Sequence, residues 1–123
     1  MLRPHTLIPI MLILLAAGCG QTKGKKSVVE LVEDLKHNDE AVRMDAAAAL
    51  GKVNSSEVSQ AVPVLSAALK DPSAYVRQSA AKSLKALGPD AQAAVPALKA
   101  ALKDSDHGVR IWAGEALENI QGK

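Results

Sequence analysis

The sequence predicts an all-α protein, a short solenoid in which three helical hairpins stack side by side. Three segments share one pattern, in which a Leu-Lys pair stands seven residues before a Val-Arg pair. The arginines of these pairs, Arg43, Arg77 and Arg110, are 34 and 33 residues apart. A period in that range is typical of stacked helix pairs, and three copies are about the fewest that form a stable stack.

The first helix of each hairpin is predicted from apolar residues at helical spacing. In the first copy they fall at positions i, i+3, i+4 and i+7 of the segment from Val28 to Leu35, with acidic residues between them. This spacing is typical of an amphipathic helix. The matching segments of the later copies contain Pro63 and Pro96. We expect both prolines near a helix start, where the missing N–H group leaves no bond unmade.

The second helix of each hairpin is predicted to bury one stripe rich in alanine, so that neighbouring helices approach closely. Short turns with Asn, Asp and Ser precede it and can cap its first N–H groups. The stretches from Asn54 to Ala61 and from Gly88 to Ala94 are predicted links between repeats. The sequence thus predicts six helices in three antiparallel pairs. The predicted buried residues are Val42, Ala46, Ala49, Leu50, Val53, Val76, Ala80, Ser83, Leu84, Leu87, Val109, Ala113, Ala116, Leu117 and Ile120.

The chain of 123 residues divides into three predicted parts. Residues 1–18 are a predicted signal peptide, residues 19–27 a modified cysteine with a flexible tether, and residues 28–123 the repeat domain. Low apolar content in the tether favours a solvated linker, although its lysines could also touch anionic lipid headgroups. The repeats are expected at about residues 28–56, 61–91 and 94–121.

The signal peptide is predicted from charge and hydropathy. Arg3 gives a short positive start, an apolar run extends from Leu7 to Ala17, and small residues precede Cys19, as in secretory signals. The run is shorter than the roughly 20 apolar residues that a membrane-spanning helix needs. An ordinary secretory signal with a chance cysteine and an uncleaved N-terminal anchor are the alternatives.

The segment from Leu15 to Cys19 resembles the lipobox of bacterial lipoproteins. The resemblance implies a diacylglyceryl group on the Cys19 sulfur and cleavage before Cys19. Fatty acyl chains such as palmitate would then anchor the mature protein, since two or more chains hold a protein stably on a membrane. The match is imperfect, because Ala16 stands where Leu is commonest. We therefore expect a lipid-anchored, extracytoplasmic protein of the bacterial cell envelope, with the outer membrane preferred over the inner.

The repeated pattern, LKD-x(4)-VR-x(2)-A-x(3)-L, resembles HEAT repeats, in particular the short PBS-lyase HEAT-like repeats, over roughly Val28 to Gln121. The resemblance implies a ladder of charge-assisted bonds between neighbouring repeats, formed by the aspartate after Leu-Lys and the arginine after Val. Asp71 with Arg77 fits that pattern, as does Asp104 with Arg110. The ladder is expected to be incomplete at the first repeat. There His37 replaces the aspartate and Arg43 has only Asp39 close by.

Composition and motifs exclude several functions at this stage. Without residues 1–18 the formal net charge falls from +2 to +1. The sequence shows no basic face with aromatic residues between the charges, so it gives no sign of nucleic-acid binding. His37 and His107 lie in separate predicted turns, without the spacing of metal ligands. The chain also lacks a nucleophile elbow and a phosphate-binding glycine loop. We therefore expect no enzyme, no cofactor, no metal and no small-molecule substrate.

A binding surface is predicted on the second helices, at positions that face away from the buried stripe. Apolar and aromatic side chains at such positions are favoured anchors for protein partners. Two alternatives remain, in which Trp112 covers the open end of the stack and Met44 packs against the first helix. The candidate partner-binding residues are Met44, Tyr75, Gln78, Lys82, Ile111 and Trp112.

The sequence therefore predicts a membrane-tethered, non-catalytic scaffold that binds a protein. The partner is unknown, and contact with the membrane is expected only through the lipid at Cys19. An accessory subunit related to phycobilin lyase HEAT-like proteins is one alternative, although the export signal argues against that intracellular chemistry. A structural component of the envelope is the other.

Overall fold

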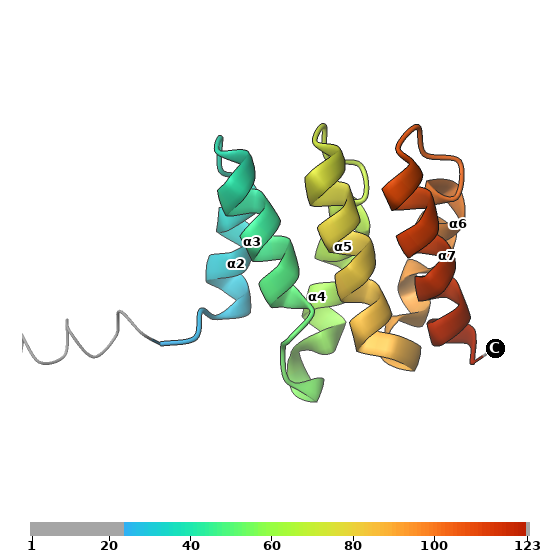
Figure 1. Cartoon of the computed structure of the whole chain (residues 1–123). Coiled ribbons are helices and arrows are strands. Elements are labelled where there is room, and N and C mark those ends of the chain that lie inside the picture. The colour runs from blue at the N-terminus through green and yellow to red at the C-terminus, as the bar shows by residue number, and fades with distance from the viewer. Residues whose placement is uncertain (1–23, 123) are drawn as a thin grey trace, which may run out of the picture.

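The computed structural model describes residues 24–122 as a stack of helical hairpins in two layers (Figure 1). All regular elements of these residues are helical, which confirms the all-α class. Short 3-10 helices, η1 and η2, separate the hairpins. The elements are α2 (Val28–Asp34), α3 (Glu40–Leu50), η1 (Ser55–Glu57), α4 (Val58–Ala68), α5 (Ala74–Leu87), η2 (Gly88–Ala94), α6 (Val95–Ala101) and α7 (His107–Gln121).

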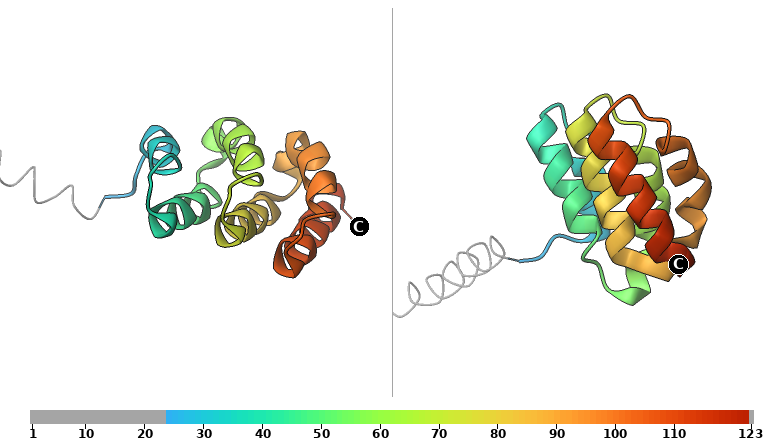
Figure 2. Two further views of the ribbon diagram at one scale, coloured as in Figure 1. Left: turned by 90° about the horizontal axis from the view of Figure 1, so that it is seen from above. Right: turned by 45° about the vertical axis from the view of Figure 1, so that its right-hand side comes forward.

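The hairpins pair α2 with α3, α4 with α5, and α6 with α7, and they stack in chain order. Seen from above, α3, α5 and α7 form one layer, whereas α2, α4 and α6 form the other (Figure 2). The second helix of each hairpin therefore packs on the second helix of the next. The predicted signal peptide and Cys19 lie outside the described residues. Between Gly24 and Gly122, no helix is both long and apolar enough to cross a membrane.

Capping side chains define where the helices begin. The Ser27 hydroxyl accepts the N–H of Glu30, whose carboxylate accepts the N–H of Ser27 at 2.8 Å, and this capping box starts α2. The bond from the Ser27 N–H also lowers the pKa of Glu30. The side chains of Asp39, Ser73 and Asp106 cap α3, α5 and α7 by accepting backbone N–H groups of the first turn. The predicted capping turns are therefore present in all three repeats.

The predicted links do join successive repeats, but both contain helical turns. In the first link Ser55–Glu57 forms η1, and the residues from Val58 already belong to α4. α4 begins at Val58, since Val58, Ala61 and Leu65 are all buried and their helical spacing extends the apolar stripe by a turn. Pro63 is consequently the sixth residue of α4 and not near its start, so the Ser59 carbonyl loses its usual donor. Pro96 does lie in the first turn of α6, as predicted.

The second link, Gly88–Ala94, forms η2 because Ala91 and Ala94 are fully buried against the stack. Gly88 ends α5 with φ +63°, a conformation that residues with a Cβ rarely adopt. The chain can therefore turn sharply from α5 into η2.

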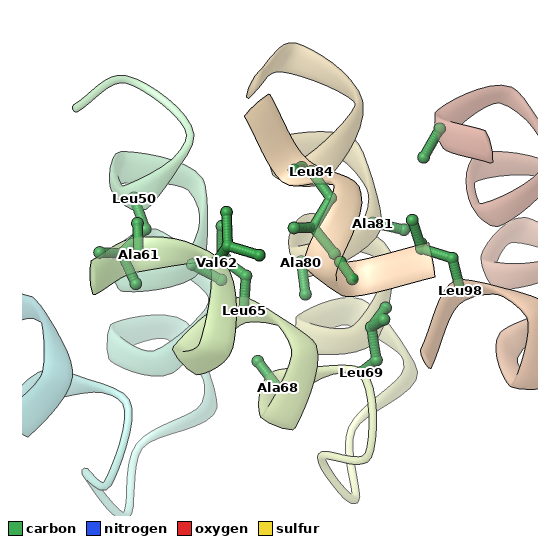
Figure 3. Close-up of a cluster of buried hydrophobic side chains, with 14 of the residues drawn as sticks. Leu50, Ala61, Val62, Leu65, Ala68, Leu69, Ala80, Ala81, Leu84 and Leu98 are labelled. Atoms are coloured by element: carbon green, nitrogen blue, oxygen red, sulfur yellow. The ribbon is translucent and has the colours of Figure 1, made fainter. Parts of the chain in front are cut away.

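The core is a row of leucines and valines separated by alanines (Figure 3). Leu50, Leu65, Leu84 and Leu98 have no exposed surface, and burial of a leucine contributes about 2 kcal/mol. All predicted residues of the third repeat are buried, whereas four predicted residues of the earlier repeats are only partly buried. Those four are Val42, Ala49, Val53 and Leu87.

Small residues set the distance between α3 and α5. The buried Ser83 hydroxyl donates to the Ala47 carbonyl at 2.6 Å. A Cβ placed on Gly51 would lie 2.7 Å from the Ser83 Cβ and 2.8 Å from its Cα. Gly51 has an ordinary φ of −77°, so the close approach of the two helices is what requires glycine here.

We predict that Gly51→Ala destabilises the protein by about 1 to 3 kcal/mol, the usual range for an overpacked core, because α3 and α5 must move apart. Gly114→Ala is the matched control, since its Cβ would meet only Leu102 Cδ2 at 3.8 Å. That control should be neutral or stabilising by up to about 1 kcal/mol, because alanine favours a helix over glycine. Chemical denaturation measures both, and equal effects would contradict the packing argument.

Candidate functional site

Two arginine–aspartate pairs join the three repeats. Arg43 donates from Nε to Asp71 Oδ2 at 3.0 Å and from Nη2 to Asp71 Oδ1 at 3.2 Å. Arg77 binds Asp104 in the same way, at 2.9 and 3.0 Å. All four side chains are no more than 16% exposed. Two parallel bonds fix both position and orientation, so each pair holds one hairpin in register with the next.

Each arginine also closes the turn of its own hairpin. Arg77 Nη1 donates to the Asp71 and Pro72 carbonyls at 2.8 and 3.1 Å. Arg110 Nη1 does the same with Asp104 and Ser105, at 2.7 and 3.1 Å. Arg43 Nη1 donates likewise to the His37 and Asn38 carbonyls, at 3.0 Å each. The three guanidinium groups therefore occupy equivalent positions in their hairpins.

The expected pairs within a repeat are corrected by this geometry. Asp71 binds the arginine of the preceding repeat and not Arg77, which reaches only the Asp71 carbonyl. His37 therefore does not interrupt the ladder, since an aspartate there would face a repeat before α2. The ladder is instead incomplete at the third repeat. Among residues 24–122, Arg110 has no carboxylate partner, and its Nη2 lies 3.4 Å from His107 Nδ1.

Hydrogen bonds at the contacts between repeats shift the pKa values of three charged side chains. Burial of Asp104 opposes its ionisation, but bonds from Arg77 and from the Asp106 N–H outweigh burial, and the pKa of Asp104 is lowered. The pKa of Asp106 is lowered by the Val109 N–H and then by the Gln78 amide. The pKa of Arg43 is raised because it donates to Asp71. All three charges are therefore favoured by the stacked arrangement.

The predicted binding residues do not form one surface. Gln78 donates to Asp106 Oδ2 at 2.8 Å and so supports the cap of α7. Met44 is half-buried. Tyr75 and Ile111 are 63% and 45% exposed, on different repeats. The structure brings together only Lys82 and Trp112 among the six.

Trp112 is the centre of a charged cluster on α5 and α7. Lys82 Nζ and Lys85 Nζ lie 4.9 and 5.1 Å from the centre of its ring, within the range of cation–π attraction. Lys85 also pairs with Glu115 at 2.6 Å. The ring faces α5 and packs partly on the core, so Trp112 does not cover the open end of the stack.

An open cavity of about 410 Å³ lies beside this cluster and is lined by Lys85, Glu115, Glu118 and Asn119. These four residues are not among the six predicted binding residues, although Glu115 and Asn119 follow Trp112 at helical spacing. An aromatic face that holds ammonium groups, next to a cavity with two carboxylates, can bind a cation. We refer to Lys82, Lys85, Trp112, Glu115 and Glu118 as the Trp112 cluster.

A second open cavity, of about 300 Å³, lies between α3 and α5. Its walls are small residues with Lys52 and Lys82 at the rim. No three His, Cys, Asp or Glu side chains gather in the described part of the chain where they could hold a metal ion. His37 lies in the turn before α3, where its Nδ1 accepts the Asp39 N–H at 3.0 Å. His107, which was predicted in a turn, is the first residue of α7.

Comparison with known families identifies the repeat. The HEAT repeat model matches residues 57–118, which is half of the chain, and the model of the PBS lyase HEAT-like repeat matches residues 42–71. The chain belongs to the HEAT repeat family. The predicted solenoid of HEAT-like hairpins is thereby confirmed, whereas the predicted lipoprotein signal remains a prediction.

Solved structures similar to this HEAT-repeat chain include human deoxyhypusine hydroxylase in complex with glycerol. The TM-score is 0.68 and the sequence identity is 27%. The match covers 81% of this chain and 34% of the hydroxylase, so the chain spans about a third of that enzyme's length. No curated protein matches the sequence.

This similarity corrects the function predicted from the sequence. We predicted a non-catalytic scaffold and no enzyme, and the match to an enzyme contradicts both predictions. The prediction rested on the lack of a catalytic motif, and the lack of a motif does not by itself decide function.

We predict that the Arg77–Asp104 pair stabilises the fold and that this contribution is lost in acid. The pKa of Asp104 is lowered from 3.8 in the folded protein, so the contribution is complete above about pH 3.8 and disappears as pH falls through the lower, folded value. Asp104→Asn should reduce the free energy of unfolding at neutral pH by about 1 to 2 kcal/mol, since bonds to charged groups contribute about 1.5 to 3 and partial solvent access weakens them.

Urea unfolding from pH 2 to pH 7 measures this difference, with the exposed Asp90→Asn as the control. The wild type and Asp104→Asn should converge at the acid end. A difference that is independent of pH would show that the ionised carboxylate is not the stabilising group.

Proposed function

We propose that this HEAT-repeat chain takes part in the enzymatic modification of a protein and binds the protein substrate at the Trp112 cluster. The observation that carries the proposal is the similarity to deoxyhypusine hydroxylase over 81% of the chain. At 27% identity and a TM-score of 0.68, the similarity extends to sequence as well as fold. An enzymatic role is therefore better supported than passive binding.

The chemistry of the Trp112 cluster favours a substrate with a positively charged side chain. Two ammonium groups already lie over the ring, which indicates that the ring attracts cations. Lys85 and Glu115 are 39% and 43% exposed, and ion pairs at such sites contribute little. A substrate amine can therefore replace a lysine over Trp112 and bind Glu115 and Glu118 at small cost.

The part proposed for residues 24–122 is substrate binding. These residues contain no cluster of three potential metal ligands, and the chain spans only about a third of the similar enzyme. We therefore assign the reacting groups to another part of the enzyme assembly. The Trp112 cluster would hold the modified side chain in place while those groups act on it.

We further propose that the enzyme works at the bacterial envelope, with the outer membrane preferred. The support is the lipobox-like segment that ends at Cys19. Labelling cells with a fatty-acid analogue should mark the wild type and leave Cys19→Ser unmarked. Equal labelling of both proteins would remove the anchor and would leave the proposal for the Trp112 cluster unaffected.

The enzymatic role predicts turnover of a modified peptide. The full chain, purified with its bound proteins from the cells that make it, is given a peptide containing deoxyhypusine and a matched peptide containing lysine. Mass spectrometry should detect one added oxygen atom on the former alone. Absence of product from both peptides would contradict the enzymatic proposal for this substrate.

Two variants test the binding site with effects of opposite sign. Trp112→Leu should raise KM about fivefold with little change in kcat, because about 1 kcal/mol of cation–π attraction is lost. Lys82→Ala should lower KM, since it uncovers the ring. Tyr75→Ala is the control for an exposed aromatic outside the cluster and should change neither constant. An unchanged KM in both cluster variants would contradict the site.

A further inference from the structure

The two ends of the stack differ in chemistry. At the end formed by α6 and α7 (Figure 1), Leu102 is 42% exposed and Ile111 is 45% exposed. The corresponding leucine of the second repeat, Leu69, is only 5% exposed because the third repeat covers it. The residues around Arg110 therefore have the character of an interior face between repeats. We call Leu102, Arg110, Ile111, Gly114 and Leu117 the C-terminal end face.

The opposite end has charged residues where an interior face has apolar ones. In the second repeat, Val64, Ala67 and Ala68 face α2 across a cavity between the hairpins. The equivalent positions of the first repeat are Glu30, Glu33 and Asp34. Lys26, just before α2, pairs with Asp34 at 2.6 Å, and the Lys25 ammonium donates to the Lys52 carbonyl at 3.1 Å. Polar outer faces of this kind close the terminal repeats of solenoids.

The hydrogen bonds of Arg110 indicate which partner the C-terminal end face can bind. Its Nη1 is held by the Asp104 and Ser105 carbonyls, as in the two arginines of the ladder. In those arginines Nε and Nη2 bind an aspartate of the next repeat. The same two groups of Arg110 have no carboxylate partner within residues 24–122. They are preorganised for a carboxylate that follows the first helix of another hairpin.

We propose that the C-terminal end face binds the first hairpin of another HEAT-like repeat chain, one with apolar residues on its edge and an aspartate after Leu-Lys. The aspartate would bind Arg110 through two bonds, and the apolar edge would cover Leu102 and Ile111. A second unaltered copy of this chain does not fit, because it presents His37 at the aspartate position and Glu30, Glu33 and Asp34 along the edge. The complex would continue the solenoid across two chains.

The experiment uses the full chain to supply both surfaces. A probe variant combines Glu30→Val, Glu33→Ala, Asp34→Ala and His37→Asp, so that its first hairpin matches the edge of the second repeat. It also contains Arg110→Ala, so that the first hairpin of one probe molecule does not bind the C-terminal end face of another. Sedimentation of the probe mixed with the wild type should give a one-to-one complex. Each protein alone should remain a monomer.

Matched variants assign the contact. Arg110→Ala in the wild-type partner, or restoration of His37 in the probe, should each weaken the complex at least tenfold, the loss expected for hydrogen bonds to a charged group. The proposal would be overturned if a folded probe formed no complex, or if Arg110→Ala left the affinity of the complex unchanged. Self-association of the wild type that depends on Arg110 would also overturn it, because a second copy would then be the partner.

A second measurement applies if the probe fails to fold. A copy of residues 89–121 is added after Gln121 of the full chain, which continues the register of the repeats. Arg110→Ala should then lower the unfolding midpoint of the extended chain as much as Arg77→Ala does, yet have a smaller effect in the original chain. An equal, small effect in both chains would overturn the proposal.

Discussion

A bidentate ion pair between successive repeats determines how this protein is assembled. Arg43 and Arg77 each follow the valine of the repeated pattern. Each closes the turn of its own hairpin with one nitrogen and binds the aspartate of the next repeat with the other two. Because one side chain performs both tasks, the shape of a hairpin and its register against the next are coupled. The orientation of α3, α5 and α7, and therefore of everything that lies on them, depends on this link.

Packing of small residues acts together with the ion pairs. The buried alanines of the second helices, with Gly51 against Ser83, let these helices approach closely. Close approach places Lys82 and Lys85 of α5 over Trp112 of α7. The Trp112 cluster is thus a consequence of the stack, since its residues come from two repeats and meet only when those repeats are in register. A repeat fold of this kind can create a site without a local motif.

The repeated pattern predicted the hairpins, their order and the caps of the second helices, because these depend on local spacing and side-chain chemistry. It did not predict that the ladder runs from each arginine to the following repeat. Asp71 and Arg77 are close in sequence, but the Arg77 side chain extends toward the third repeat and binds the Asp104 carboxylate. Likewise α4 was predicted too short because Pro63 was taken as a helix start, whereas burial of Val58 and Ala61 extends the helix past it.

The candidate site also depends on contacts between repeats that local sequence spacing does not predict. Trp112 and Lys82 are predicted as surface residues from their positions relative to the arginines. The pairing of Lys85 with Glu115 beside them, and the cavity that both line with Glu118, depend on how α5 and α7 pack together. Searching one chain for catalytic motifs led to the wrong functional class. The similarity to an enzyme corrected it, because fold and sequence together carry information that a motif does not.

The direction of the ladder is tested most directly by double-mutant cycles on the unfolding free energy. Alanine substitutions of Arg77 and Asp104, singly and together, should give a coupling free energy of at least about 1 kcal/mol, as residues in direct contact do. The same cycle on Arg110 and Asp104 should give a value near zero, since Arg110 contacts only the Asp104 carbonyl. Coupling of Asp104 to Arg110 and not to Arg77 would contradict the account.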